Sequence, residues 1–332
     1  MKSQLHMLRL VYPPVSNQEA EWIKSDVEVQ KQLERSNLYM IAQRREANYT
    51  EFQQSVRNSG DVKFNFNIEG VESDEVIIDC NEILKNRNVF LETDEIELEW
   101  GDKKFKLWKC DQKSEPAELI EWFTTEKLLF DRWRQNPGIY GLKNYRKFTN
   151  YYLHYIGVSK RNDSLTRLIK NAHEKRIQIL SNEHPIAKTS RLSDEIYMFF
   201  FEVEPLRVNV IGIDDERTDI KDVNFDKKKI IADAEKALIN IMKPKYNEII
   251  FSQYPKGKDG LYEEGFDRYV FSIAEDISFE TKDSKITGGY LTSLHEGEAW
   301  FVSNDADGIL IEGENIEFFK AEDLKRWTGN QT

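Results

Sequence analysis

The sequence predicts an α+β protein with three consecutive domains, and three features of the 332-residue chain support this prediction. Segments with alternating or continuous apolar character, which are typical of strands, occur in all three parts of the chain, together with capped amphipathic segments typical of helices. The Asn-Pro-Gly segment at 136–138 interrupts the chain after the first part. The charge balance also changes: residues 137–250 hold 20 basic and 16 acidic side chains, but residues 251–332 hold 8 and 17. The predicted domains are residues 1–135, 136–252 and 253–332.

The first predicted domain combines helices and strands. Residues 17–58 are polar and helix-prone, whereas the alternating apolar side chains within residues 62–110 predict strands. We expect a further helix over residues 116–135, because Pro116 suits a first helical turn and four apolar side chains form a stripe. These side chains are Leu119, Trp122, Phe123 and Leu128.

The middle domain is predicted to be a small mixed sheet with helices. Two strands are expected first, at Ile139-Tyr140 and at residues 151–159, and two more at residues 195–204 and 207–213. The helix between the two pairs begins at Asp163 or Ser164, either of which can cap it, and ends near Leu180. Asp226 can cap the last helix, which stops at Pro244. The third domain, residues 253–332, is predicted to be acidic and rich in strands.

The overall composition argues against several classes of protein. A formal net charge of −12 disfavours generic binding of nucleic acid, because an acidic surface repels phosphates. The two cysteines, Cys80 and Cys110, have no paired spacing and favour a reduced, cytoplasmic protein without a zinc ribbon. The N-terminus does not resemble a signal peptide, and no segment approaches the length of a membrane span. We therefore expect a cytoplasmic protein without a membrane partner.

A basic patch nevertheless lies within this acidic chain. Residues 137–176 hold nine basic side chains and only two acidic ones, Asp163 and Glu174. Such a patch is a candidate anion-binding surface, although a solvated helix face has the same composition. The nine basic residues are Lys143, Arg146, Lys147, Lys160, Arg161, Arg167, Lys170, Lys175 and Arg176.

Several polar residues of the middle domain occur in an order that suggests a catalytic site. Tyr140 ends the tripeptide Gly-Ile-Tyr and Tyr155 begins the tripeptide Tyr-Ile-Gly, on two strands that we expect to pair as a hairpin. Arg167 is expected on the exposed side of the following helix. Glu235 is expected on the last helix, and Asn247 follows it in the segment Lys-Pro-Lys-Tyr-Asn.

This ordered set, together with Ser159 in the turn after the second tripeptide, resembles the GIY-YIG nuclease family over residues 137–250, about a third of the chain. The resemblance implies metal-dependent cleavage of a phosphodiester backbone. It further implies that Tyr140 is the general base, that Tyr155 positions water or phosphate, and that Asn247 braces the site by hydrogen bonding.

The other implied roles agree with the chemistry of the side chains. The guanidinium of Arg167 presents several donors that match phosphate oxygens. Mg²⁺, or Mn²⁺ in its place, needs few protein carboxylates and keeps several waters, so that Glu235 alone suffices as the metal ligand. The metal stabilises the leaving oxygen as a Lewis acid. A tyrosine, whose ordinary pKa is about 10, needs cationic neighbours to act as a base.

The sequence departs from the family at one position. The family has a His or Tyr about one helical turn after the arginine, where this chain has Asn171. His173 lies two residues further, on the apolar side of the expected helix. Either His173 replaces the His or Tyr of the family, which requires a local distortion of the helix, or it is only a histidine at the boundary of the core. The long gap between the two tripeptides predicts an extended hairpin loop that contacts DNA. The expected nucleic-acid contacts are Lys143, Arg146, Lys147, Lys160, Arg161 and Lys170.

These observations predict a magnesium-dependent endonuclease that hydrolyses DNA, with restriction or phage defence as the expected setting by analogy with other proteins of this type. The acidic flanking domains are expected to bind a protein partner or to form a homo-oligomer. Three alternatives stay open at this stage. The chain is an RNA-directed nuclease, a nucleic-acid-binding adaptor with a degenerate site, or a scaffold whose basic patch binds another protein.

Overall fold

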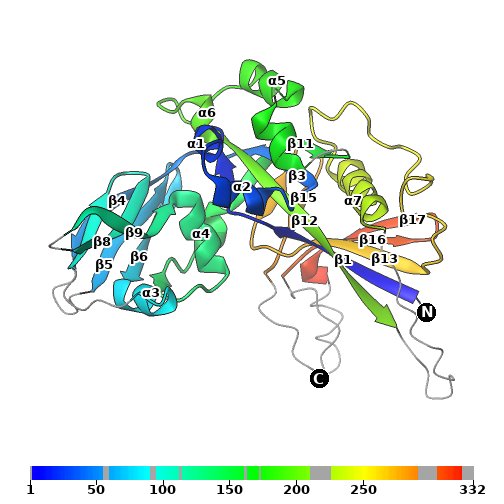
Figure 1. Cartoon of the computed structure of the whole chain (residues 1–332). Helices are drawn as coiled ribbons and strands as arrows, with labels where there is room; N and C mark the ends of the chain where they lie inside the picture. Colours follow the sequence, from blue (N-terminus) through cyan, green and yellow to red (C-terminus); the bar gives the residue numbers. More distant parts are fainter. Residues whose placement is uncertain are drawn as a thin grey trace. The chain divides into compact units, whose positions relative to one another are not determined.

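The structure, a computed structural model, divides into two compact units, each built from more than one stretch of chain (Figure 1). We call them the main unit and the inserted unit. The main unit comprises Met1–Arg44, Asn150–His184 and Leu192–Thr332, and the inserted unit comprises Arg45–Thr149 and Pro185–Arg191. The three consecutive domains expected from the sequence are therefore not the compact units. The structure describes residues 2–54, 60–89, 95–111, 114–160, 163–171, 173–209, 226–290 and 305–323.

A mixed sheet of ten strands forms the main unit, in agreement with the predicted α+β class. Its strands follow the order β15-β14-β11-β3-β12-β1-β13-β16-β17, and β2 pairs with β12. Neighbours are antiparallel except for the pairs β1 with β13 and β11 with β14. The bounds are β1 Lys2–Leu10, β2 Val15–Ser16, β3 Leu38–Gln43, β11 Asn150–Val158, β12 Ile196–Asn209, β13 Arg268–Ile273, β14 Ser278–Glu280, β15 Lys285–Thr287, β16 Gly308–Glu312 and β17 Asn315–Phe319.

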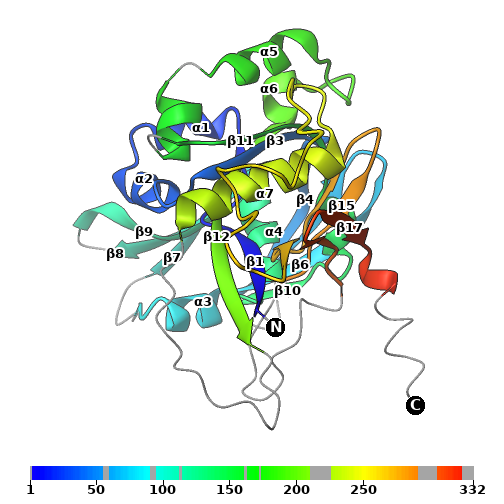
Figure 2. The same cartoon turned by 90° about the vertical axis from the view of Figure 1, so that its right-hand side faces the viewer.

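Helices pack against the central strands of this sheet. Side chains of β3 and β12 that point to the same face form one apolar cluster with residues of the helical segments, among them Leu33, Leu168 and Ile179. Helix α7 contacts β11 and β12 (Figure 2). The bounds are α1 Glu19–Ile23, α2 Val27–Leu33, the π-helical turn η2 Thr166–Lys170, α5 Glu174–Asn182, α6 Leu192–Glu195 and α7 Lys227–Met242. No described helix is long and apolar enough to cross a membrane.

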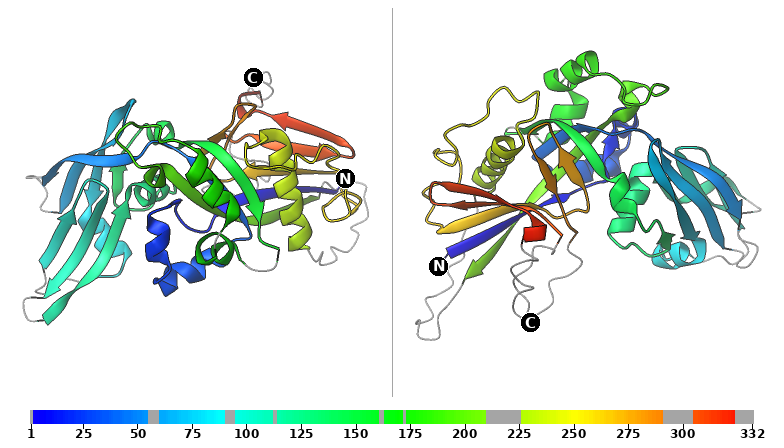
Figure 3. Two further views of the ribbon diagram at one scale, coloured as in Figure 1. Left: turned by 90° about the horizontal axis from the view of Figure 1, so that it is seen from above. Right: turned by 180° about the vertical axis from the view of Figure 1, so that it is seen from behind.

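The described strands of the acidic tail belong to the main sheet and not to a sheet of their own. Strand β13 pairs with β1 from the N-terminus, and β14 pairs with β11. In Figure 3 the blue strand β1 lies beside the yellow-orange strand β13, and the red strands β16 and β17 follow on the far side of β13. The strand-rich stretch at residues 308–319 contains two strands, β16 and β17, which pair as a hairpin, but much of the expected strand at 288–294 and all of that at 298–304 lie outside the described residues.

The inserted unit contains two antiparallel sheets around an aromatic core. Their orders are β10-β6-β5-β4 and β7-β8-β9. Phe105 stacks on Phe123 with ring centroids 5.5 Å apart, and Tyr49 meets Phe64 edge to face at 4.9 Å. The bounds are β4 Ala47–Gln54, β5 Asp61–Ile68, β6 Val71–Asp79, α3 Cys80–Asn86, β7 Glu95–Trp100, β8 Lys104–Asp111, β9 Ser114–Thr124, α4 Thr125–Trp133, β10 Ile139–Gly141 and the 3₁₀ turn η1 Tyr145–Phe148.

The helix predicted over residues 116–135 was only half correct. Its first half is strand β9, which pairs with β8, and its second half is α4. Thr124 begins the helix because its hydroxyl accepts a hydrogen bond from the backbone N–H of Lys127. Pairing with β8 buries Phe123, so tertiary contacts outweigh the local helical pattern here.

The hairpin expected between the strands of Tyr140 and Tyr155 does not form. Strand β10, which holds Tyr140, pairs with β6 inside the inserted unit. Strand β11, which holds Tyr155, pairs with β3 and β14 in the main unit. The residues between them include η1, so the expected DNA-binding hairpin loop is absent from the described part of the chain.

Candidate active site

Two tyrosines of neighbouring strands lie side by side in the main unit. Tyr39 is on β3 and Tyr155 on β11, and their ring centroids are 6.1 Å apart. Gly157 pairs with Tyr39 in the ladder. A Cβ atom at Gly157 would lie 2.7 Å from both the hydroxyl of Tyr39 and a ring atom of Tyr155. The glycine of the Tyr-Ile-Gly tripeptide therefore allows the two phenols to approach each other.

Replacing Gly157 with Ala is expected to lower the stability of the main unit by about 1–3 kcal/mol, because the fully buried Tyr39 has no room to move away. Urea unfolding followed by tyrosine and tryptophan fluorescence measures this change. Gly257→Ala is the matched control in the same unit, since its nearest obstacle is the flexible Lys236 Nζ at 3.4 Å. Equal stability of the two variants would contradict the close approach.

His173 reaches the tyrosine pair because the expected helix over residues 163–180 is broken. Asp163 accepts a hydrogen bond from the Thr166 N–H, a π-helical turn follows, and Asn171 is extended. His173 then caps the new helix α5, where its Nδ1 accepts from the N–H of Arg176. Its Nε2 lies 3.0 Å from the hydroxyl of Tyr39. The local distortion that the sequence left open is therefore present.

The protonation state of His173 follows from these contacts. Burial, and then the nearby Arg167 guanidinium, lower the pKa of His173 to about 4. The ring is therefore neutral near pH 7, and because Nδ1 accepts a hydrogen bond its proton resides on Nε2. Nε2–H donates to the oxygen of Tyr39, which leaves the hydroxyl hydrogen of Tyr39 for another acceptor.

That acceptor is Tyr155, which shares a hydrogen bond with Tyr39. Burial is the main cause that raises the pKa of both phenols, and Arg167 opposes it at both. Their hydrogen bond raises the pKa of Tyr39 and lowers that of Tyr155, as expected when Tyr39 donates. Tyr155 is also the less buried of the two. It is therefore the phenol that loses its proton more readily.

Arg167 places an exposed guanidinium at the edge of this group. Its Nη1 donates to the carbonyl of Val158 at 2.6 Å, and its guanidinium carbon lies 5.9 Å from the ring centroid of Tyr39. The carbonyl bond orients the side chain, and the remaining donors can bind an anion such as a phosphate.

Glu235 lies in the middle of α7 and is half-buried. Burial raises its pKa to about 7, although Lys160, Arg167 and a hydrogen bond from the backbone of Val158 each act in the opposite direction. The positive charge of Arg167 therefore acts on this carboxylate as well as on the two tyrosines.

The residues present fit a hard divalent ion bound through one carboxylate. The described residues contain no group of three or more His, Cys, Asp or Glu side chains that could enclose a metal ion. Magnesium does not require such an enclosure, since it binds through one or two carboxylates, substrate phosphates and several waters. Glu235, half-buried and close to Arg167, can supply that carboxylate.

Asn247 fixes the strand that carries Tyr155. Its side-chain Oδ1 accepts from the N–H of Ile156 at 3.0 Å, and its Nδ2 donates to the carbonyl of the same residue at 2.8 Å. The turn after α7 holds Asn247 in place through a bond from its N–H to the carbonyl of Pro244. The Asn247 amide therefore holds the backbone of Ile156, the residue after Tyr155.

The other predicted residues are placed differently. Tyr140 belongs to the inserted unit, is 48% exposed and hydrogen-bonds to Glu82, so it is not among the clustered residues. Lys143, Arg146 and Lys147 also belong to the inserted unit. Of the remaining expected contacts, Lys160 acts on Glu235, Lys170 pairs with Glu34 at 3.4 Å, and Arg161 lies outside the described residues.

Sequence reasoning missed Tyr39. A usable signal exists in the segment Leu-Tyr-Met-Ile-Ala at 38–42, a buried strand with a polar hydroxyl near its start. Comparison of the chain with protein-family models, curated proteins and solved structures finds no match.

Proposed function

We propose that the chain is a metal-dependent endonuclease that hydrolyses DNA phosphodiester bonds, in which Tyr39 lies beside Tyr155 in place of Tyr140, and Tyr155 acts as the general base. The observation that carries this proposal is the cluster of Tyr39, Tyr155, Arg167, His173 and Glu235 in one compact unit, with Asn247 bracing it. Three stretches distant in the sequence contribute these side chains: strand β3, the stretch from β11 to the start of α5, and α7 with the turn after it. The resemblance to the GIY-YIG family supports the proposal, with Asn-Leu-Tyr at 37–39 in place of the first tripeptide.

The roles of the charged residues follow from their exposure and position. The exposed guanidinium of Arg167 binds the nonbridging oxygens of the scissile phosphate and stabilises the charge that develops on them. Glu235 would hold Mg²⁺ or Mn²⁺, which when bound supplies Lewis-acid stabilisation of the leaving oxygen. Lys160 adds positive charge near the same carboxylate.

Tyr155 is the general base in this proposal. Its oxygen accepts the hydrogen bond of Tyr39, and Arg167 and Lys175 favour its ionised form. The neutral His173 donates to Tyr39 and so keeps the hydrogen of Tyr39 directed at Tyr155. Tyr39 and His173 therefore stabilise the phenolate of Tyr155, which takes a proton from the attacking water.

The Mg²⁺ requirement is expected to depend on pH, because the proton and the metal compete for Glu235. With a pKa of about 7, about a tenth of this carboxyl is ionised at pH 6 and about nine tenths at pH 8. The Mg²⁺ concentration for half-maximal cleavage is therefore expected to be about tenfold higher at pH 6 than at pH 8. Metal titrations of plasmid cleavage at both pH values measure it. The same half-maximal concentration at both would contradict the assignment of Glu235.

Incubation of the full-length protein with supercoiled plasmid, with and without Mg²⁺ or Mn²⁺, tests the proposed activity. Metal-dependent nicking that Glu235→Gln abolishes is the expected result. Cleavage of RNA but not of DNA would favour the RNA-directed nuclease. Binding of nucleic acid without cleavage of either would favour the adaptor.

A further inference from the structure

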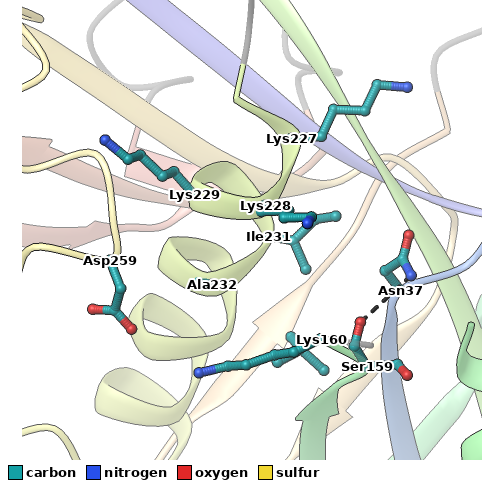
Figure 4. A pocket seen from close by; sticks show the side chains of 10 residues that line it. Asn37, Ser159, Lys160, Lys227, Lys228, Lys229, Ile231, Ala232 and Asp259 are labelled. Atoms are coloured by element: carbon teal, nitrogen blue, oxygen red, sulfur yellow. Dashed lines mark hydrogen bonds between the residues drawn. The ribbon is translucent and has the colours of Figure 1, made fainter. Parts of the chain in front are cut away.

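A cavity of about 410 Å³ lies in the main unit beside the candidate active site (Figure 4). The first turns of α7 form one side, and the end of β11 with the two residues after it forms another. Asn37, which precedes β3, closes the cavity through a hydrogen bond from its side chain to the carbonyl of Ser159. The volume falls in the range of about 300–1,000 Å³ that small-molecule sites occupy.

The lining combines an apolar surface with a basic rim. Val158, Ile231 and Ala232 supply aliphatic atoms, and Lys227 and Lys228 of the first turn of α7 also line the cavity. Within the described ranges, no carboxylate lies at ion-pair distance from Lys227 or Lys228. Since no described carboxylate pairs with them, these two cations can attract an anionic ligand.

Two further charges of the lining have partners of opposite sign. Asp259 is paired with Lys236, and Lys229 is paired with Glu264. The side chain of Asp226 accepts hydrogen bonds from the first backbone N–H groups of α7, so the lysine side chains rather than the helix terminus provide the positive charge.

Val158 connects this cavity with the candidate active site. The carbonyl of Val158 accepts a hydrogen bond from Arg167, and its backbone also hydrogen-bonds to Glu235. Val158 itself lines the cavity. Ile231, on the opposite wall, lies one helical turn before Glu235. A phosphate bound between Arg167 and Glu235 would thus place the adjoining nucleotide at the mouth of the cavity.

We propose that this cavity binds one unstacked nucleotide of the substrate strand. This inference rests on the nuclease function proposed above. The base packs against the aliphatic wall, and Lys160, Lys227 and Lys228 bind the flanking phosphates. A base paired within a duplex cannot enter a cavity of this size, so the nucleotide must be unpaired or turned out of the helix. The protein is therefore selective for DNA with an unpaired nucleotide near the cleaved bond.

Fluorescence of 2-aminopurine tests the cavity without relying on cleavage, because this base brightens when it leaves a stack. The probes are a duplex with one bulged 2-aminopurine and the same duplex with that base paired. When the full-length Glu235→Gln protein binds, the emission of the bulged probe is expected to rise by roughly twofold or more. The protein is also expected to bind the bulged probe more tightly than the paired probe.

Two variants of the Glu235→Gln protein test whether the fluorescence gain and the binding of the probe depend on the cavity. Ala232→Phe fills the cavity and is expected to remove the fluorescence gain. Lys227→Ala with Lys228→Ala leaves the fold intact, because both residues are exposed, and is expected to weaken binding and reduce its salt slope by about 2. The control pair, Lys282→Ala with Lys285→Ala, removes the same charge from exposed positions elsewhere in the main unit.

The outcomes separate this inference from the nuclease proposal. A fluorescence gain that the cavity variants remove, in a protein that cuts neither DNA nor RNA, would support the cavity and contradict the nuclease. Cleavage without any fluorescence gain, or lysine variants that behave as the control pair does, would overturn the cavity proposal. Failure to bind either probe would overturn it as well.

Discussion

Tyr155→Phe is expected to reduce DNA cleavage by about 10²–10⁴-fold, the contribution that a general base usually makes. The substitution removes the oxygen that accepts the hydrogen bond of Tyr39 and, in the proposed mechanism, the proton of the attacking water. Tyr140→Phe is the matched control and should leave the rate unchanged, because Tyr140 is exposed and bonded to Glu82 in the inserted unit. Single-turnover cleavage of plasmid at saturating Mg²⁺ measures both rates.

Tyr39→Phe tests which of the two neighbouring tyrosines, Tyr39 or Tyr155, is the general base. The loss of its hydrogen bond is expected to raise the pKa of Tyr155 and so move the rising limb of the pH–rate profile to higher pH, with partial activity recovered there. A loss of activity that is equal at all pH values would instead make Tyr39 the base. A Tyr140→Phe variant as inactive as Tyr155→Phe would contradict the proposed cluster.

Glu235→Gln is expected to abolish cleavage and at the same time to stabilise the protein above pH 7. The folded-state pKa of Glu235, about 7, exceeds its ordinary value of 4.5 because burial disfavours the charged form. Its contribution to stability is therefore complete below about pH 4.5 and is lost as pH rises through 7. Each pKa unit corresponds to about 1.4 kcal/mol, which gives an upper limit of about 3 kcal/mol for the stabilisation by Gln at pH 8.

Urea unfolding at pH 5 and pH 8 without divalent ions measures this effect, and the difference between the two proteins isolates Glu235 from other titrating groups. Mg²⁺ should reduce the difference in unfolding free energy between the two proteins at pH 8, because it stabilises only the wild type and a ligand of the folded state favours folding. A Gln variant that is less stable than the wild type at pH 8 would show that the carboxylate has a structural role. An inactive but more stable variant is the pattern expected at a functional site.

The local chemistry of the site could be predicted from the sequence, because it depends on short-range patterns. The N-cap at Asp226 and the stop before Pro244 place Glu235 inside a helix. The cap at Asp163 likewise fixes the turn that carries Arg167. Asn247 follows Pro244 in a short turn, whose backbone hydrogen bond limits where its amide can point.

Strand pairing could not be predicted, because it depends on contacts between distant segments. The Gly-Ile-Tyr tripeptide at 138–140 looks like half of a hairpin, yet its glycine has a different purpose. Gly138 adopts a φ of +85°, and a Cβ there would lie 2.7 Å from a side-chain atom of Ile83. The glycine serves a tight turn of the inserted unit. Tyr39 has no glycine beside it in the sequence, so its only signal is a hydroxyl within an apolar strand.

The interruption of the predicted helix after Lys170 is a second feature that could not be predicted from the sequence. A continuous helix from Asp163 to Leu180 satisfies the apolar spacing, and it would direct His173 toward the apolar side. The observed π-helical turn and the extended Asn171 change that direction, so that His173 meets Tyr39. Irregular turns of this kind often occur at functional sites and leave no clear periodicity.

The insertion between β3 and β11 has a consequence for how the protein assembles. Gln43 and Tyr152 are partners in the ladder, so the two ends of the stretch Arg45–Thr149 emerge from adjacent strands. Closing an unfolded loop of that length costs more entropy than closing one that has already collapsed into a compact body. We infer that the inserted unit folds before the two tyrosine strands meet. The side chains of the candidate site then come together only after this unit has folded and the segments that carry Arg167 and Glu235 have followed it.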